Sequence, residues 1–444
     1  MSLTYKVLLG MVLGIVVGLA INFSGMNSPG SFVNEFVVDG AFYVVGKMFV
    51  NALKMMVVPL VLFSLICGVC GIGDVRLLGR IGTKAFVLYM FTTAIAIASA
   101  LVIAAGLGIG QGMNAATTAE FSGKEAPPLT EVLIGVIPSN PINAMSQGEM
   151  LSIIFFAILF GISLLMVGKK ASQAIEFIEI MNEVMIKMVG LIMVLAPYAV
   201  FCLIAKAMAD LGMDLLMQLI GYVTVLIAVL LFHLFVTLQL VLKVFSGLSP
   251  LIFLKKIRSA QVFAFSTSSS NATIPVTLRT VTERMGVNNS VGSLTVPFGA
   301  TINMDGTAIM QGVATVFIAN IYNVDLGMGG YLTVIMMSVL ASIGTAGVPG
   351  VGLIMLSMVF AQVGLPIEGI GLILGVDRLL DMIRTAVNVS GDAVVSTVVA
   401  KSENKLDLAV YNDPEAGTFR TEDVHLDEAV ERELAGIVKA THDK

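Results

Sequence analysis

Apolar runs that are long enough to cross a lipid bilayer follow one another along most of this chain. A transmembrane helix needs about 20 mainly apolar residues. The runs before residue 250 predict six such helices, at 5–21, 42–72, 86–110, 151–167, 178–205 and 215–244. The first run starts at Lys6 like a signal peptide, but no A-x-A cleavage site follows it and a second span does. We therefore expect it to remain as the first transmembrane helix.

Beyond residue 250 the apolar runs are interrupted at their centres by polar segments or by segments rich in Gly and Pro. The interruptions are STSSSNATIP at 266–275 in run 257–281, TINMDGT at 301–307 in run 291–321, and SIGTAGVPGVG at 342–352 in run 332–363. Basic residues flank both ends of the first run and neither end of the third. The first is therefore expected to be a re-entrant hairpin from the cytoplasm and the third one from outside. Close helix packing would explain the small residues, but not Asp305, Asp381 and Asp392 at one depth.

The last apolar run, 367–400, has a polar stripe. On a helix that turns about 100° per residue, its five polar positions fall within an arc of roughly 80°; they are Asp377, Asp381, Arg384, Asn388 and Asp392. A charge at the membrane centre costs on the order of 3 kcal/mol, so the stripe should face protein, water or ions. Asp381 and Arg384 could alternatively be an i, i+3 structural pair.

Basic residues in the connections predict the orientation of the helices. They follow the second, fourth and sixth helices, at Arg76, Arg80, Lys84, Lys169, Lys170, Lys255, Lys256 and Arg258. The alternate connections, 22–40 and 113–149, are poor in Lys and Arg. Loops rich in Lys and Arg lie on the cytoplasmic side of a membrane, so both termini are expected in the cytoplasm.

Composition excludes a soluble protein. Of 444 residues 57% are hydrophobic and 12% charged, where a soluble domain has about 25% charged. Residues 402–444 hold eleven acidic and five basic side chains, so this cytoplasmic tail alone is net −6 while the whole chain is −5. No P-loop, HExxH or GxSxG motif and no basic nucleic-acid patch occurs. We expect no enzyme, no organic cofactor and no nucleic-acid partner, and transport driven by an ion gradient.

Cysteine and histidine add little to this interpretation. Cys67 and Cys70 form a C-x-x-C without a second pair, and Cys202 stands alone, so packing is favoured for all three. His233 has no carboxylate or second His near it in the sequence, and packing is favoured over a proton relay.

The polar groups of the second half fit a particular ligand. Helix N-termini at the hairpin tips suit a carboxylate. Arg384 offers a planar fork to a second carboxylate, and Asp381 can accept an ammonium group. Carbonyls of the broken 301–307 segment, with Asp305 and Asp392, suit a hard monovalent cation. A ligand with two carboxylates and one amine is an acidic amino acid.

The segments SSSNATIP, NMDGT, GTAGVPG and DMIRTAVNVSGD closely resemble the dicarboxylate/amino acid:cation symporter family, the glutamate transporter family, from Lys6 to about Lys401. The resemblance implies an all-α membrane protein with eight transmembrane helices and two oppositely oriented re-entrant hairpins, arranged as inverted repeats. It implies a homotrimer in membrane lipid. Helices 1, 2, 4 and 5 of domain 1–401 would form a scaffold. Helices 3, 6, 7 and 8, with hairpins 250–284 and 331–364, would move like an elevator.

The same resemblance implies site residues. The substrate contacts would be Ser268, Ser269, Ser270, Thr307, Val348, Pro349, Gly350, Val351, Gly352, Asp381, Arg384 and Asn388. Three sodium sites would use Gly299, Asn303, Asn388 and Asp392; Thr301, Ser342, Ile343 and Thr345; and Tyr89, Thr92, Thr93, Asn303 and Asp305. The outer hairpin would be the gate.

Three positions depart from the family pattern. Ser268 stands where archaeal relatives have Arg, and Arg378 could supply that charge. Gln311 stands where animal relatives have a Glu that is linked to proton and potassium coupling, and Thr93 replaces a Ser. The sequence therefore does not decide whether glutamate or aspartate is the preferred substrate.

The sequence thus predicts sodium-coupled symport of L-glutamate or L-aspartate in the plasma (inner) membrane. Proton coupling is the main alternative. Within the family, a C4-dicarboxylate carrier would lack Asp381 and a neutral amino-acid carrier would lack Arg384. A channel would need no outer gate, and an intramembrane enzyme would need a nucleophile and base that the sequence does not place.

Overall fold

The computed structural model describes residues 3–70, 78–112, 134–343, 347 and 349–417. These residues form helices and connecting loops, and their one extended contact is an isolated antiparallel bridge between Val287 and Leu406. The protein is therefore helical throughout the part that the structure describes, as the sequence predicts.

The first half consists of long apolar helices and shorter helical segments that adjoin or connect them. They are α1 (Leu3–Phe23), η1 (Val33–Phe42), α2 (Tyr43–Cys70), η2 (Leu78–Gly82), α4 (Thr83–Leu107), α6 (Pro141–Gln147), α7 (Met150–Val167), η4 (Gly168–Ala171), α8 (Ser172–Val194), α9 (Ala196–Phe232), η5 (His233–Thr237) and α10 (Leu238–Ser246). Among the described residues, five stretches are long and apolar enough to cross a membrane: Tyr5–Phe23, Val33–Cys67, Arg80–Leu107, Ser152–Val194 and Ala196–Ser246. The two longest correspond to predicted helices four to six, which run nearly end to end.

The predicted fifth helix, 178–205, is wrong as one unbroken element. Helix α8 ends at Val194, and α9 begins at Ala196 with Pro197 in its first turn. Proline has no N–H to donate and fits only the first turn of a helix, so it sets this boundary. A second change of direction lies inside α9 at Gly212, whose φ of +64° favours glycine. The predicted sixth helix begins just after it.

The second half consists of shorter helices around one long one. They are α11 (Pro250–Thr267), α12 (Ser270–Arg279), η6 (Thr280–Arg284), α13 (Asn289–Ile302), α14 (Asp305–Ile321), α15 (Gly327–Ser342), α16 (Val351–Gln362), η7 (Ile367–Gly369), α17 (Ile370–Ser402) and α18 (Leu408–Asn412). The chain leaves the helical path in all three predicted interruptions, between α11 and α12, between α13 and α14, and between α15 and α16. The breaks are thus confirmed.

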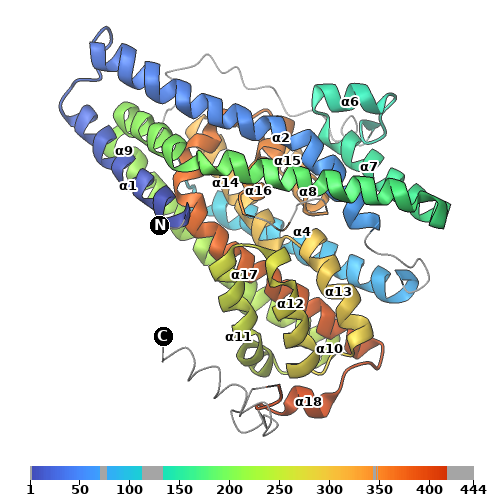
Figure 1. Ribbon diagram of the computed structural model, residues 1–444. Helices are drawn as coiled ribbons and strands as arrows, with labels where there is room; N and C mark the ends of the chain where they lie inside the picture. The colour runs from blue at the N-terminus through green and yellow to red at the C-terminus, as the bar shows by residue number, and fades with distance from the viewer. Residues whose placement is uncertain (1–2, 71–77, 113–133, 344–346, 348, 418–444) are drawn as a thin grey trace, which may run out of the picture.

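Helix α17 organises the molecule. It packs against α11, α13, α14 and α10, and near its start also against α9 and α1 (Figure 1). Helices α1, α2, α8 and α9 lie together on one side, and α10 to α13 gather with α18 at the other end. The polar stripe of α17 is therefore covered by other helices, as its composition predicts.

Candidate substrate and ion site

The centre of α17 holds one guanidinium between two carboxylates. Arg384 is fully buried, and it donates from Nη1 to Asp377 Oδ1 at 2.7 Å and from Nη2 to Asp381 Oδ1 at 2.8 Å. The i, i+3 pair that the sequence suggested is therefore present. Asp377 is a second partner to which the sequence analysis gave no site role. Its place on the same stripe, seven residues before Arg384, was the signal that could have identified it.

Two buried polar atoms of this centre have no hydrogen-bond partner among the described residues. They are Asp381 Oδ2 and Arg384 Nε. Asp381 Oδ2 has a guanidinium of Arg378 at 3.6 Å, beyond hydrogen-bonding distance. A buried polar group without a partner costs about 1–3 kcal/mol. Asp381 thus keeps an acceptor, and Arg384 keeps a donor, for a further polar group.

Two predicted substrate contacts lie beside the Arg384 guanidinium. A β-carbon added at Gly352, in α16, would lie 3.4 Å from Arg384 Nη2 and 3.4 Å from the Thr307 methyl group, so these three residues from three helices are brought together. A small cavity borders the same region, lined by Asp377, Arg378 and Asp381 with Gly350 and Leu353 of the outer pair and Met193 of α8. The stripe therefore opens toward both α16 and α8.

Asn388 joins α17 to the break between α13 and α14. Its Oδ1 accepts the N–H of Gly306 at 2.7 Å, and its Nδ2 lies 3.3 Å from Met304 Sδ. A β-carbon at Gly306 would lie 2.6 Å from the Arg384 carbonyl oxygen. The first turn of α14 thus sits directly on α17, and Asn388 has a structural partner in addition to any ligand.

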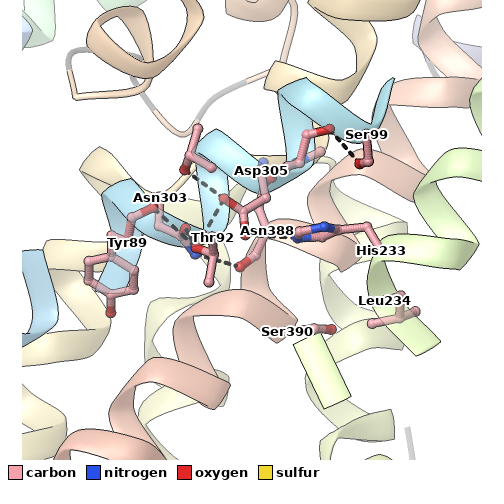
Figure 2. Close-up of polar contacts among 12 residues, drawn as sticks. Tyr89, Thr92, Ser99, His233, Leu234, Asn303, Asp305, Asn388 and Ser390 are labelled. Atoms are coloured by element: carbon pink, nitrogen blue, oxygen red, sulfur yellow. Dashed lines mark hydrogen bonds and ion pairs between the residues drawn. The ribbon is translucent and has the colours of Figure 1, made fainter. Parts of the chain in front are cut away.

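A second cluster gathers oxygen atoms around Asp305, the first residue of α14. Figure 2 shows Asp305 between the hydroxyls of α4 and the imidazole of His233. Asp305 Oδ1 accepts from Thr93 Oγ1 at 2.6 Å and from Thr92 Oγ1 at 3.4 Å. Thr92 also lies 3.4 Å from Asn303 Oδ1. The structure therefore brings together Thr92, Thr93, Asn303 and Asp305 of one predicted sodium set.

The same cluster continues to Asp392 and Tyr89 through Asn303 and Gly299. Asn303 Nδ2 donates to Asp392 Oδ1 at 2.9 Å. A β-carbon at Gly299 would lie 2.7 Å from Tyr89 Oη and 2.8 Å from the Asp392 carboxyl carbon, so only glycine allows this approach. The Tyr89 hydroxyl itself donates to the Thr295 carbonyl at 2.9 Å. Thus Tyr89, Gly299, Asn303 and Asp392 meet, and the Asn388 carbonyl lies 3.4 Å from Asn303 Nδ2.

His233 has a carboxylate partner, so the expectation that it only packs is wrong. Its Nε2 lies 3.1 Å from Asp305 Oδ2, and both side chains are fully buried. The two residues are 72 positions apart in the chain. Only the fold, which places η5 against α14 and α4, brings them together.

The remaining predicted sodium set is not assembled in the described residues. Thr345 lies outside them. The hydroxyls of Thr301 and Ser342 donate to carbonyls of their own helices, Phe298 at 2.8 Å and Val339 at 2.7 Å. Ile343 is buried at the end of α15. Gly347 nevertheless lies against α13, since its β-carbon would be 2.9 Å from the Ala300 carbonyl oxygen.

The turns of the two helix pairs touch each other. The Gly347 carbonyl accepts from Ser269 Oγ at 2.7 Å and from the Asn271 N–H at 3.1 Å. Ser268 is buried with a φ of +51°, and Ser270 is buried at the start of α12. Val348 lies outside the described residues, while Pro349, Gly350, Val351 and Gly352 lead into α16. The Ser269 hydroxyl is thus bonded to the outer pair, where the sequence analysis assigned it to substrate.

Gln311 and the three cysteines lie outside the two clusters described above. Gln311 is buried in α14, and its Oε1 has no hydrogen-bond partner in the part of the chain that the structure describes. The cysteines Cys67, Cys70 and Cys202 are free thiols, and Cys70 Sγ lies 3.8 Å from the Gly161 carbonyl of α7. Among the described residues no three His, Cys, Asp or Glu side chains gather as a metal group. The Asp305 cluster, built of carboxylate, amide and hydroxyl oxygens, instead suits a hard cation such as sodium.

The model of the sodium:dicarboxylate symporter family matches residues 3–402. The chain is 31% identical over 433 residues to a proton/sodium-glutamate symport protein of Bacillus caldotenax, covering 95% of this chain and 98% of that one. It is 33% identical over 418 residues to the proton/glutamate-aspartate symporter of Escherichia coli (strain K12), covering 91% and 94%. A C4-dicarboxylate transport protein of Bacillus subtilis (strain 168) is 31% identical over 416 residues, covering 92% and 95%.

Proposed function

Because the chain belongs to the sodium:dicarboxylate symporter family, we propose that it takes up L-glutamate or L-aspartate together with sodium ions. The family makes it a multi-pass membrane transporter and not an enzyme, with an acidic amino acid or dicarboxylate as substrate. The choice of an acidic amino acid and of sodium is the proposal. It is supported by the residues of α17 and of the α13–α14 break.

The observation that carries the proposal is the arrangement around Arg384. Among the described residues, neither its Nε nor Asp381 Oδ2 has a hydrogen-bond partner, although both are buried within one turn of α17. A substrate side-chain carboxylate would accept from the guanidinium, and the substrate ammonium group would donate to Asp381. The nearby Thr307 hydroxyl and Gly352 backbone would contact the same molecule. A C4-dicarboxylate has no ammonium group to satisfy Asp381.

Sodium coupling is supported by the cluster that centres on Asp305 and Asp392. Hydroxyl, amide and carboxylate groups of α4, of the α13–α14 break, of α14 and of α17 lie within hydrogen-bonding distance of one another there. Gly299, Tyr89, Thr92, Thr93, Asn303 and the Asn388 carbonyl would share the coordination of two ions. A further ion at Thr301, Ser342, Ile343 and Thr345 would require those groups to turn toward one another.

Transport would follow an elevator-type alternating-access mechanism. Helices 1, 2, 4 and 5 of the predicted set, represented by α1, α2, α7, α8 and the first part of α9, would be the scaffold of a homotrimer. The pairs α11–α12 and α15–α16 would be the inner and outer re-entrant hairpins, corresponding to 250–284 and 331–364. The protein would lie in the plasma (inner) membrane with both termini and the acidic tail 402–444 in the cytoplasm.

Proton coupling is the second candidate, and a specific contact supports it. The relatives include a proton/glutamate-aspartate symporter, and His233 contacts Asp305 inside the proposed ion cluster. The two ions can be separated by experiment, since one gradient can be supplied without the other. A C4-dicarboxylate or neutral amino-acid substrate is tested by the same uptake assay.

The test is uptake into proteoliposomes of labelled glutamate, aspartate, succinate and serine, with a sodium gradient or a pH gradient supplied separately. We expect uptake of glutamate or aspartate with inward sodium and none of serine. Uptake driven by the pH gradient alone would refute sodium coupling, and uptake of succinate alone would refute the amino-acid substrate.

A variant tests the role of the guanidinium. Arg384→Cys should abolish uptake of both acidic amino acids, because it removes the group that pairs with the second carboxylate. Arg279→Cys is a matched control, since Arg279 is half-exposed and pairs with Glu283 at the cytoplasmic end of α12. Unchanged acidic amino-acid uptake by the Arg384 variant would contradict the assignment.

A further inference from the structure

The segment after α17 folds back onto the ends of the α11–α12 pair. Helix α17 ends at Ser402, and Asn404 has a φ of +55°, at which the chain reverses. Residues 403–413, here called the strap, then run beside the loop that follows η6.

The strap binds one end of the pair through backbone hydrogen bonds. The Asn288 N–H donates to the Lys405 carbonyl at 2.9 Å, and the Asp407 N–H donates to the Gly286 carbonyl at 2.8 Å. These bonds flank the Val287–Leu406 bridge. Gly286 has a φ of +73°, and a β-carbon there would lie 3.1 Å from Val410 Cβ. This contact follows directly from η6, which continues α12.

The strap binds the other end of the pair through Tyr411. Its hydroxyl donates to the carbonyl of Ser249, the residue before α11, at 3.0 Å. The Tyr411 side chain is fully buried, although it lies in a short segment beyond the last long helix. Burial also raises the pKa of this phenol above its usual value, so the hydroxyl stays protonated and able to donate.

Lys256 of α11 connects this helix to both η6 and the strap. Its Nζ donates to the Arg284 carbonyl at 2.6 Å and to the Val410 carbonyl at 2.7 Å, and it lies 5.8 Å from the centre of the Tyr411 ring. Arg284 in turn donates from Nη1 to the Lys256 carbonyl at 3.2 Å. Lys256 is only 2% exposed, whereas its neighbour Lys255 is exposed. A buried lysine that donates to two carbonyls cross-links the segments that carry them. Lys256 therefore has a structural role in addition to its use as a basic residue that predicts membrane orientation.

We propose that Lys256 is a positioning residue, which together with the strap fixes the roots of the α11–α12 pair and so holds its turn, Ser268 to Ser270, in place. The inference rests on the proposed function, in which this turn contacts the substrate. Both roots are bound to the same short segment, so neither helix can shift along the other without breaking these bonds. The inner pair then moves as part of one rigid unit, and opening is left to the outer pair.

The test uses the full-length protein and two readouts. Lys256→Met keeps the length of the side chain but leaves the carbonyls of Arg284 and Val410 without their donor. We expect amide hydrogen exchange in 268–279 to rise about tenfold, since a lost buried bond is worth about 1.4 kcal/mol. We expect KM for the amino acid to rise severalfold with a smaller change in kcat, and Lys256→Arg to restore part of both.

Lys255→Met is the matched control and should leave exchange and KM unchanged. Tyr411→Phe removes only the bond to Ser249 and should give a smaller rise in exchange, so it decides the question if the Lys256 variant cannot be purified folded. Unchanged exchange at 268–279 in Lys256→Met, or in Tyr411→Phe where that variant stands in, would overturn the proposal. Exchange is measured without substrate, so this result is independent of whether glutamate and aspartate are the transported molecules.

Discussion

At the scale of single residues, the site combines paired charges on α17 with close approaches between helices that only glycine allows. Asp377, Asp381 and the two arginines Arg378 and Arg384 carry formal charges that sum to zero within two and a half turns of α17. Each charge is paired, which lets the group remain buried. The ion cluster has fewer opposite charges, so its carboxylates depend on hydroxyl and amide partners. Glycines make room for these partners.

Gly299→Ala should abolish sodium-dependent uptake. The added β-carbon would lie 2.7 Å from Tyr89 Oη, and the Asp392 carboxylate would have to move as well. Such a displacement changes the distances between the oxygens proposed to bind sodium. The measurement is the initial rate of glutamate and aspartate uptake into proteoliposomes at increasing sodium concentration.

Gly329→Ala is the matched control for this substitution. Gly329 lies in α15, and a β-carbon there meets no atom within 4 Å. Alanine also favours a helix over glycine. This variant should retain wild-type sodium dependence, and a loss of uptake in both variants would indicate a general sensitivity of the fold.

The sequence could identify most of the residues of the site but not their partners. Asp381, Arg384, Asn388 and Asp392 were recognisable because polar and charged residues on one face of an apolar helix require a reason. The contact of His233 with Asp305 was missed, because His233 stands in an apolar run and Asp305 is 72 positions away in the sequence. Ser269 was assigned to substrate, and only the structure places its hydroxyl on Gly347.

At the scale of elements, small residues decide how closely helices approach. Gly10, Gly14 and Gly18 lie on one face of α1, against backbone carbonyls of Pro197, Phe201 and Ala205 in α9. Small residues let helix backbones come together in membranes, where lipid gives no hydrophobic drive for association. The pair α1–α9 is accordingly the most extensive helix contact of the described chain.

Gly14→Leu should destabilise the protein by about 1–3 kcal/mol, because a large side chain at a close helix crossing forces the helices apart. A β-carbon there would lie 2.8 Å from the Phe201 carbonyl oxygen. The measurement is the thermal unfolding midpoint in detergent. Gly190→Leu, in α8, is the control, since a β-carbon at Gly190 meets nothing within 4 Å and the midpoint should change little.

A second element contact predicts a dependence on pH. Glu403 begins the strap, and it pairs with Lys84 of α4 and Arg80 of η2. The hydrogen bond from Lys84, followed by that from Arg80, lowers the pKa of the Glu403 carboxyl below its usual value. The charged form is thus favoured in the folded state. Its contribution to stability is present above the ordinary pKa of a glutamate and is lost as the pH falls through the lowered one.

Glu403→Gln should therefore lower the unfolding midpoint at neutral pH and have no effect at a pH below the lowered pKa. The measurement is the difference in midpoint between wild type and variant across that range. Glu176→Gln is the control, because Glu176 is exposed on α8, away from Lys84 and Arg80 in the sequence. A difference for Glu403→Gln that stays constant with pH would contradict the assignment of the stabilisation to these ion pairs.

The elements were predictable where their signals are local. The three breaks of the second half came from Gly, Pro, Ser and Asn in otherwise apolar runs, and the structure has a break in each. The boundary at Leu195 was missed, because Pro197 sits inside a run that is apolar on both sides. The sequence analysis treated the strap only as part of the acidic cytoplasmic tail, because its contacts depend on α11 and η6 rather than on its own composition.

At the scale of the whole molecule, α17 is in contact with both proposed units. Its centre and end pack on α11, α13 and α14, while its first turns pack on α9 and α1. Glycines again line this second contact. A β-carbon at Gly371 would lie 3.1 Å from Leu203, and one at Gly375 would lie 3.1 Å from Ile204 and 3.2 Å from Met11. A face of glycine against aliphatic side chains offers few hydrogen bonds to break on sliding.

If the proposed elevator operates, Gly375→Leu should slow transport without weakening substrate binding. The leucine would project into Ile204 and Met11 and obstruct movement of α17 along α9, as in a shear motion of packed helices. We expect the maximal uptake rate to fall about tenfold or more, and the Kd for labelled aspartate or glutamate in detergent to stay within about twofold. Gly221→Leu, at a position in α9 with nothing within 4 Å, should change neither quantity. An equal loss of binding and uptake in the Gly375 variant would place its effect in the substrate site, and unchanged uptake would argue against movement along this face.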